Sequence, residues 1–388
     1  MNHKILTHRI STLALLFSAV ALSVAITFTS PAQAGTVAKP PKIQLAILLD
    51  TSNSMDGLID QTRNQLWQVV NEFSSARQNG VTPVLQIALF EYGNDNNSFR
   101  KGYVRKLNNF TRELDAVSES LFSLTTNGGA EFCGYAIKDA VTTLQWSHSD
   151  SDIKTIFIAG NESFAQGPVS FRQAIKLATK QGITVNTIHA GSHDEGINDN
   201  WQTGALLAGG DYLSIDADQQ IVHIDAPQDE EISQLNAQLN RTYIPYGSDG
   251  ADKLERQMEQ DAQSSGISSG LLAKRVKSKS SSFYRNSNWD LVDAFEDGEV
   301  TKESLVQLEA EALPEPMKDM DAAEKLDYVQ QKAVARKNIK QRISQLSELR
   351  DTYVAEKKRE MVVAAPSVSD ALTNAVRKEA NAKNFVFD

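Results

Sequence analysis

The stretch IQLAILLDTSNS, residues 43–54, decides how the first half of this chain is interpreted. Its first seven residues are mostly apolar and partly β-branched, which is typical of a short buried strand. Asp50, Ser52 and Ser54 follow at alternate positions, and a loop leaving the strand can turn these three side chains inward together. One carboxylate and two hydroxyls are the kind of oxygen ligands that Mg²⁺ takes in proteins. The stretch therefore predicts a strand that ends in a metal-binding loop.

A second interpretation of the same loop is structural. Ser54 directly precedes Met55-Asp56, where a helix is expected to begin, and serine is a favoured helix N-cap. The loop alone does not distinguish capping from metal binding, so the surrounding pattern has to be considered.

Apolar runs recur downstream and alternate with amphipathic helical segments. Such runs occupy residues 84–90, 153–159, 183–189 and 212–215, and a polar turn at 93–97 predicts a hairpin into an edge strand near 103–107. This alternation predicts an α/β fold with a doubly wound, mostly parallel sheet. Ligands of such folds bind beyond the carboxyl ends of the strands, and Asp50 is placed at one of those ends.

The Asp50-x-Ser52-x-Ser54 spacing, together with this alternation, resembles the von Willebrand factor type A (VWA) domain in its exported bacterial form. The resemblance covers about residues 42–245. It implies a metal-ion-dependent adhesion site, called MIDAS, in which three loops surround a hard divalent cation. It also implies Mg²⁺, or Mn²⁺ or Ca²⁺, as the bound ion, and a protein as the partner. The α/β domain is accordingly assigned to residues 42–247.

The other two loops depart from the family pattern. Alignment on the start of the next helix places Glu131 where the family has a threonine, and Gly160 stands where the family has an aspartate. Asn161 and Glu162 follow Gly160 and are expected to contact the metal ligands without binding the ion themselves. The carboxylate count stays at two, so Asp50, Ser52, Ser54 and Glu131 are the predicted metal ligands. Alternatively, Glu131 is only a favourable charge at a helix N-terminus.

The first residues predict export. Lys4 and Arg9 precede an apolar run at 13–28 and then Ala32-Gln33-Ala34, the three regions of a signal peptide cleaved before Gly35. The run is shorter than the ~20 residues that a membrane span needs, which disfavours an anchor. We therefore expect residues 1–34 to be removed, the mature chain to lack a transmembrane segment, and the protein to be periplasmic or secreted.

The net charge and the cysteine content exclude some classes of partner and of covalent link. The formal net charge is −10, from 39 basic and 49 acidic residues, which argues against nucleic acid and anionic membranes as partners. Cys133 is the single cysteine, so an intrachain disulfide is excluded.

Residues 248–388 are predicted to be mainly helical. Residues 248–282 are predicted to form a polar helix and a Ser/Gly/Lys-rich flexible linker, and residues 283–388 a helical tail. An aromatic cluster at 283–295 suggests a segment that docks on the first domain. Near-heptad apolar spacing at 339–354 suggests a coiled coil or a single long helix, although Arg350 interrupts it. Self-association through the tail is one consequence.

These observations favour a non-enzymatic, exported, metal-dependent protein-binding module for adhesion or assembly. Two alternatives remain: a periplasmic metal-dependent hydrolase that uses Asp50, and a structural assembly protein with a vestigial metal site. His189 and His193 are expected at the same strand-end face, where they could bind a softer metal or belong to a solvated acidic loop.

Overall fold

The computed structural model of the chain describes residues 39–53, 55–215, 223–360 and 368–387. The predicted signal peptide and Ser54 lie outside these residues. Residues Pro40–Asp388 form one compact unit.

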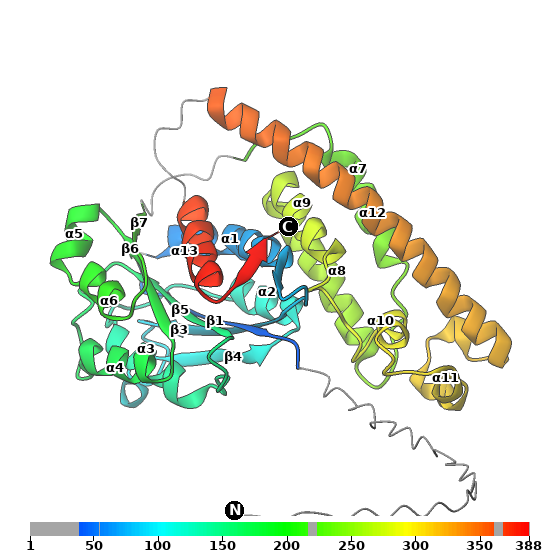
Figure 1. Cartoon of the computed structure of the whole chain (residues 1–388), viewed down its shortest axis with the longest axis horizontal. Helices are drawn as coiled ribbons and strands as arrows, with labels where there is room; N and C mark the ends of the chain where they lie inside the picture. The colour runs from blue at the N-terminus through cyan, green and yellow to red at the C-terminus, as the bar shows by residue number, and fades with distance from the viewer. Residues whose placement is uncertain (1–38, 54, 216–222, 361–367, 388) are drawn as a thin grey trace, which may run out of the picture. The chain divides into compact units, whose positions relative to one another are not determined.

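The centre of this unit is a six-stranded sheet with the strand order β4-β3-β1-β5-β6-β7 (Figure 1). All neighbours are parallel except β3 and β4, which are antiparallel. This confirms the predicted mostly parallel sheet and its hairpin to an edge strand. The strands are β1 (Lys42–Asp50), β3 (Val84–Tyr92), β4 (Arg105–Thr111), β5 (Ile153–Gly160), β6 (Thr184–Ala190) and β7 (Tyr212–Ile215).

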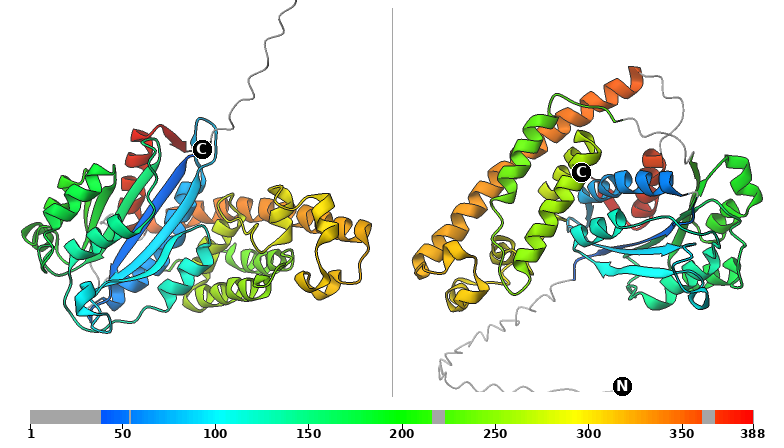
Figure 2. Two further views of the ribbon diagram at one scale, coloured as in Figure 1. Left: turned by 90° about the horizontal axis from the view of Figure 1, so that it is seen from below. Right: turned by 180° about the vertical axis from the view of Figure 1, so that it is seen from behind.

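Helices cover both faces of the sheet (Figures 1 and 2). Successive residues of β1 point to opposite faces, so Leu45 enters one core cluster and Leu48 the other. One face is covered by α1 (Asp56–Ser74) and α2 (Leu114–Phe122), and the other by α3 (Cys133–Thr143), α4 (Phe171–Lys180) and α6 (Trp201–Leu207), with the short α5 (His193–Asn198) before α6.

The expected linker is instead folded, and that part of the sequence interpretation is wrong. Residues 248–282 contain α8 (Gly250–Ile267) and α9 (Ser269–Ser280), and α9 packs against α1, α7 (Asp229–Asn240) and α8. Eight of its twelve residues are buried. The Ser- and Lys-rich composition concealed this because two of its basic side chains are neutralised inside the protein.

Those two side chains are Arg275 and Lys279, both 0% exposed. The Arg275 guanidinium lies 2.8 Å from an Asp115 oxygen on α2 and 2.7 Å from an Asp261 oxygen on α8, and Lys279 Nζ lies 2.8 Å from Asp261. Arg275 also stacks over the Trp67 ring at 4.8 Å. A buried charge is tolerated only when it is paired, and this network supplies the pairs.

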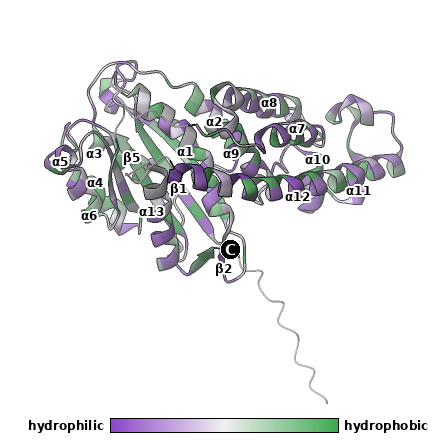
Figure 3. Ribbon diagram, turned by 90° about the horizontal axis from the view of Figure 1, so that it is seen from above, coloured by the Kyte–Doolittle hydropathy of each residue, from purple (hydrophilic) through white to green (hydrophobic). Residues whose placement is uncertain are grey.

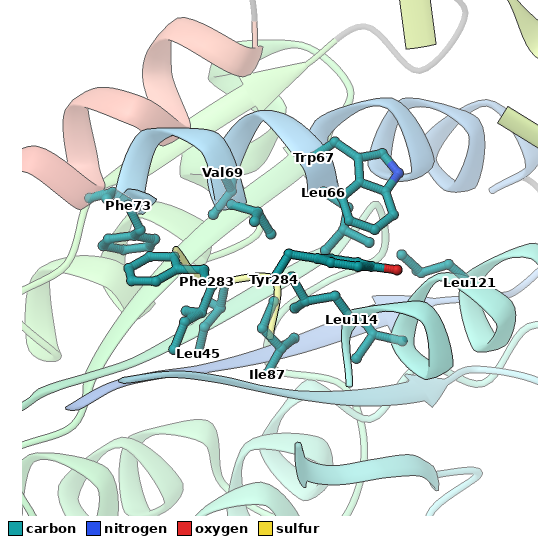
Figure 4. Close-up of a cluster of buried hydrophobic side chains, with 14 of the residues drawn as sticks. Leu45, Leu66, Trp67, Val69, Phe73, Ile87, Leu114, Leu121, Phe283 and Tyr284 are labelled. Carbon is teal, nitrogen blue, oxygen red and sulfur yellow. The ribbon is translucent and has the colours of Figure 1, made fainter. Parts of the chain in front are cut away.

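The segment after α9 completes the core between α1 and the sheet. Phe283 and Tyr284 are buried there, as Figure 4 shows, and the Tyr284 hydroxyl donates a hydrogen bond to Asp115. The structure therefore agrees with the interpretation of this aromatic segment as one that docks on the first domain. The residues around the two rings are Leu45, Leu66, Trp67, Val69, Phe73, Ile87, Leu114 and Leu121.

The long helix α12 (Ala322–Glu360) packs on neighbours within the same chain, chiefly α7, α9, α10 (Leu291–Glu296) and α11 (Lys302–Gln307). Arg336 lies 2.5 Å from Asp290 and 2.9 Å from Asp293, and Arg350 lies 2.6 Å from Asp229. Arg350, which interrupts the heptad spacing, is thus a buried ion-pair partner. Figure 3 shows hydrophilic and hydrophobic residues alternating along the helix.

The C-terminal residues return to the sheet region. Helix α13 (Val368–Ala382) contacts α1 and β7, and β8 (Phe385–Phe387) pairs antiparallel with β2 (Ala76–Gln78). Phe385 is buried in the same core cluster as Leu45. Helix α1 is therefore flanked by two later segments: Asn71 bonds to Lys274 and Ser278 of α9, and Glu72 pairs with Arg377 of α13.

Across the described residues, none of the helices combines the length and the apolar character needed to cross a membrane.

Replacing Arg275 by alanine should leave the Asp115 carboxylate buried without a cation, and Asp261 paired with Lys279 alone. Breaking a buried ion pair in this way costs about 3–5 kcal/mol of unfolding free energy. Arg256→Ala is the matched control, because that arginine pairs with Glu119 at the partly exposed surface, where a pair contributes about 0–1 kcal/mol. Chemical denaturation of both variants measures the difference, and equal losses would contradict the assigned role of the network.

Candidate metal centre

The candidate site lies where three parallel strands end side by side. Asp50 is the last residue of β1 and is in register with Tyr92, the last residue of β3. Gly160 ends β5 on the other side of β1. The backbone N–H of Ser52 donates to Asp50 Oδ1 at 2.8 Å, which folds the first loop back over its own carboxylate.

Backbone hydrogen bonds join this first loop to the loop before α3. The Asn127 N–H donates to the Thr51 carbonyl at 3.0 Å, and the Asn53 N–H donates to the Gly128 carbonyl at 3.0 Å. The Asn94 side chain, from the loop after β3, donates to the carbonyls of Thr51 and Thr125. The loops that surround Asp50 are therefore fixed to one another independently of any ion.

Glu131 reaches the same point from the residues before α3. It is buried, its backbone N–H donates to Gln166 Oε1 at 2.5 Å, and its Oε2 accepts from the Glu162 N–H at 3.2 Å. A methyl group at Gly93 would lie 2.7 Å from Asp50 Oδ1 and 2.9 Å from Glu131 Cγ. The two carboxyl side chains therefore flank one glycine, and only glycine leaves room for both.

Burial and the neighbouring carboxyl group set the electrostatics. Burial, followed by the proximity of Glu131, raises the pKa of Asp50 well above its ordinary value of 3.8. Burial likewise raises the pKa of Glu131 above 4.5, although the neighbouring Asp50 and Ser52 side chains and the hydrogen bond from the Glu162 N–H oppose the rise. Two buried carboxylates this close can both stay ionised only if a cation lies between them. Otherwise one of them keeps its proton.

The donor set fits a hard divalent cation. Within the described chain, Asp50 Oδ2 and Ser52 Oγ are buried and make no hydrogen bond of acceptable geometry, so both oxygens remain free to bind an ion. Two carboxylates and a hydroxyl match the preference of Mg²⁺ for a few protein oxygens plus waters. The described residues contain no cluster of three or more His, Cys, Asp and Glu suited to a metal, so the fit rests on the mixed carboxylate and hydroxyl set.

The third loop explains why a glycine stands at position 160. A methyl group there would lie 2.4 Å from the Tyr92 hydroxyl oxygen and 3.0 Å from Asp50 Oδ2. The Tyr92 hydroxyl is buried and donates to the Ala159 carbonyl at 2.9 Å. Tyr92 therefore occupies the space in which a carboxylate from this loop would have to be placed.

The remaining predicted residues have supporting or separate positions. Glu162 contributes its N–H to Glu131 while its side chain is exposed, and the Asn161 carbonyl faces His189 Nε2 at 3.1 Å. His189 Nδ1 lies 3.2 Å from the Ser192 carbonyl oxygen, so both ring nitrogens face loop carbonyls. His193 packs on Tyr212 at the outer edge of the sheet.

Sequence reasoning did not single out Tyr92, Gly93 or Gln166 as parts of the site. The position of Tyr92 opposite Asp50 follows from strand register, which the apolar run 84–90 does not define. Gly93 carried a signal, because a glycine directly after a strand often has positive φ, and its φ is 79°.

Comparison with known protein families identifies the domain that carries these loops. Residues 44–197 match the family model of the von Willebrand factor type A domain. The chain contains a VWA domain. No protein with a curated description matches the chain at a significant level.

Several solved structures resemble the VWA domain region. BatB from Bacteroides thetaiotaomicron is 15% identical with a TM-score of 0.34, covering 45% of this chain and 90% of that one. An aerotolerance-related membrane protein from Bacteroides fragilis is 18% identical with a TM-score of 0.31, covering 45% and 92%. Proximal thread matrix protein 1 from the mussel byssus, with a zinc-occupied MIDAS motif, is 14% identical with a TM-score of 0.34, covering 46% and 43%.

The raised pKa values make a stability prediction. In the metal-free protein, the folded state keeps a proton on the Asp50–Glu131 pair, whereas the unfolded state releases it near the ordinary pKa values of 3.8 and 4.5. The free energy of unfolding therefore falls as pH rises through that range and up to the raised pKa values of the folded state. Mg²⁺ replaces this proton, so the rise in Tm on adding Mg²⁺ should be larger at about pH 8 than at about pH 5. Asp50→Asn should abolish this rise, whereas the exposed control Asp95→Asn should keep it. Equal Mg²⁺ responses in all three proteins would exclude this site.

A second prediction concerns Glu131. Glu131→Thr restores the residue found in the family but removes one of two carboxylates, so Mg²⁺ affinity should fall by at least about tenfold. Adding Gly160→Asp should fail to recover it, because the new side chain would collide with Tyr92. Isothermal titration of both variants measures this, and recovery in the double variant would show that the third loop is free to rearrange.

Proposed function

We propose that the protein is an exported, non-enzymatic protein-interaction module whose strand-end face is organised by a divalent cation. Asp50, Ser52 and Glu131 would hold the ion, with Ser54 as a further ligand, and Mg²⁺, Mn²⁺ and Ca²⁺ match these oxygens. The observation that carries the proposal is the buried Asp50–Glu131 pair. Asp50 Oδ2 and the nearby Ser52 Oγ are buried and have no hydrogen-bond partner among the described residues.

Burial of the site determines how the ion would contribute. Asp50, Ser52 and Glu131 are each at most 2% exposed. A cation here would compensate two like charges that lie on loops already joined by hydrogen bonds, so it would stabilise the existing shape of the face. Recognition of the partner then falls mainly to the residues on the rim of the site. This differs from capture of a partner carboxylate by an open metal, because Glu131 already supplies the second carboxylate.

The same burial disfavours the hydrolase alternative. A nucleophilic or metal-activating aspartate has to lie within about 3 Å of the reacting atom of a bound substrate. Asp50 is instead enclosed by Gly93, Gly160 and Tyr92. The alternative of a structural assembly protein with a vestigial site differs from our proposal in one measurable property, which is the affinity for the cation.

Export and assembly rest on the sequence and on the helical region. The leader at residues 1–34 supports a periplasmic or secreted location. Helices α7–α12 pack onto the VWA domain through α1 and α2, which supports their role as a scaffold that presents the domain. Self-association through this region remains part of the proposal.

Immobilised full-length protein should retain a protein partner from an extract of its native cells in Mg²⁺ and lose it in EDTA. Asp50→Ala should lose the partner in both conditions, and Asp95→Ala should behave as wild type. The same preparations should not turn over generic phosphate or acyl esters. Retention that is indifferent to Mg²⁺ and to Asp50→Ala would favour the vestigial-site alternative, and Mg²⁺-dependent ester turnover would favour the hydrolase.

A further inference from the structure

An exposed aromatic and basic turn lies on the rim of the strand-end face. Residues 99–106, FRKGYVRK, connect the loop after β3 to β4 and contain four basic residues and no acidic one. Phe99 is 67% exposed, although it is a large apolar residue. Arg100 and Lys101 next to it are also exposed. We call Phe99, Arg100, Lys101 and Tyr103 the rim patch.

The backbone of this turn is strained at Tyr103. Tyr103 has φ of 56°, while the three other described non-glycine residues with positive φ are asparagines, which tolerate it. Gly102 has φ of 63°, and a methyl group there would lie 2.4 Å from the Tyr135 ring. A bulky residue in the left-handed region is strained, and such strain clusters at functional sites.

Aromatic contacts fix the turn to the candidate metal centre. The Phe99 and Tyr103 rings meet edge to face at 5.8 Å, and the Tyr103 and Phe132 rings at 5.6 Å. Phe132 directly follows Glu131 in the chain. The rim patch therefore ends a row of three rings that begins beside a predicted metal ligand, and the outermost ring faces solvent.

The charge of this surface is opposite to that of the whole protein. In the described structure no acidic side chain forms an ion pair with Arg100, Lys101 or Lys106, and Arg105 is paired with Glu91. Lys101 and Lys106 both lie near Asp139 on α3. The four cations of residues 99–106 thus have two acidic neighbours, Glu91 and Asp139, in a chain whose net charge is −10.

We infer that the rim patch is the docking surface for an acidic segment of a protein partner that also carries apolar side chains. Arg100 and Lys101 would pair with its carboxylates, and Phe99 would contact an apolar side chain, since aromatic residues and arginine are enriched at protein–protein interfaces. This rests on the proposed function, and it names the surface that makes the contact. The rings and the two cations point to a protein segment rather than a lipid surface, because the basic area is small.

The first test uses a defined probe, a fluorescein-labelled peptide of four Glu-Leu-Asp repeats, and full-length protein in Mg²⁺. Fluorescence anisotropy should show binding that weakens as salt is raised. Phe99→Ser should weaken it at least tenfold, and so should the double change Arg100→Glu with Lys101→Glu. Lys357→Glu with Lys358→Glu, a matched basic pair at the end of α12, should leave it unchanged. These side chains are at the surface, so circular dichroism should show all variants folded.

Two outcomes of this test would overturn the inference. One is equal binding of the uncharged peptide with Gln-Leu-Asn repeats, or no binding of either peptide. The other is binding to phosphatidylglycerol vesicles that the rim-patch variants abolish while the acidic peptide stays unbound, which would assign the surface to a membrane.

Measuring peptide binding in Mg²⁺ and in EDTA tests this inference separately from the proposed function. If peptide binding depends on Mg²⁺ and Asp50 but not on Phe99, Arg100 and Lys101, the rim patch is wrong and the metal-organised module stands. If binding depends on the rim patch and is the same in EDTA, the patch stands and the role of the cation is wrong.

A photo-crosslinker in place of Phe99 examines the natural partner directly. Benzoylphenylalanine at position 99 should crosslink, in native cells, to a peptide of net negative charge from another protein, whereas the same group at Val334, exposed on α12, should not. A lipid adduct or a basic peptide at position 99 would overturn the inference.

Discussion

The whole arrangement depends on the pairing of buried cations on α9 with carboxylates that other helices supply. Arg275 and Lys279 could not be enclosed without Asp115 and Asp261, and unless they are enclosed α9 cannot lie against α1. Asp115 belongs to α2 of the VWA domain, so this network crosses from the α/β domain into the helical region. Once α9 is in place, Phe283 and Tyr284 fill the core between α1 and the sheet.

A second case of compensated charge lies at the strand ends. Asp50 and Glu131 have the same sign and share one buried space with Ser52, so they require a proton or a cation. In the helical region, Arg275 and Lys279 neutralise the buried carboxylates. Among the described residues, no basic side chain pairs with Asp50 or Glu131. That difference is the physical reason to place an ion there, and it explains why the two buried charge clusters have different functional meanings.

Much of the fold could be predicted from local pattern. The apolar runs gave the strands of the sheet, and Asp50 could be placed at a strand end because parallel strands present their carboxyl ends together. Glu131 was found because its distance from the next helix is local. Helix α9 was missed because its burial depends on partners 14 to 211 residues away, and its own serines and lysines are typical of a linker. The conflict between Tyr92 and a carboxylate at position 160 was also out of reach, since it depends on how a side chain from β3 crosses to β5. The antiparallel pairing of β8 with β2 joins segments about 300 residues apart, which no local pattern indicates.

Helix α1 begins just after the first loop of the candidate site and carries α9 and α13 on its later turns. A single helix thus has the candidate metal site at one end and the helical region along its side. Thermodynamic linkage is reciprocal: if an ion that orders the loop favours one position of α1, then anything that favours the same position from the side of α9 or α13 must raise the affinity for the ion by the same factor. A partner that draws the C-terminal segment away from α1 would, by the same relation, lower the affinity for the ion, so occupancy of the site would report whether the helical region is engaged.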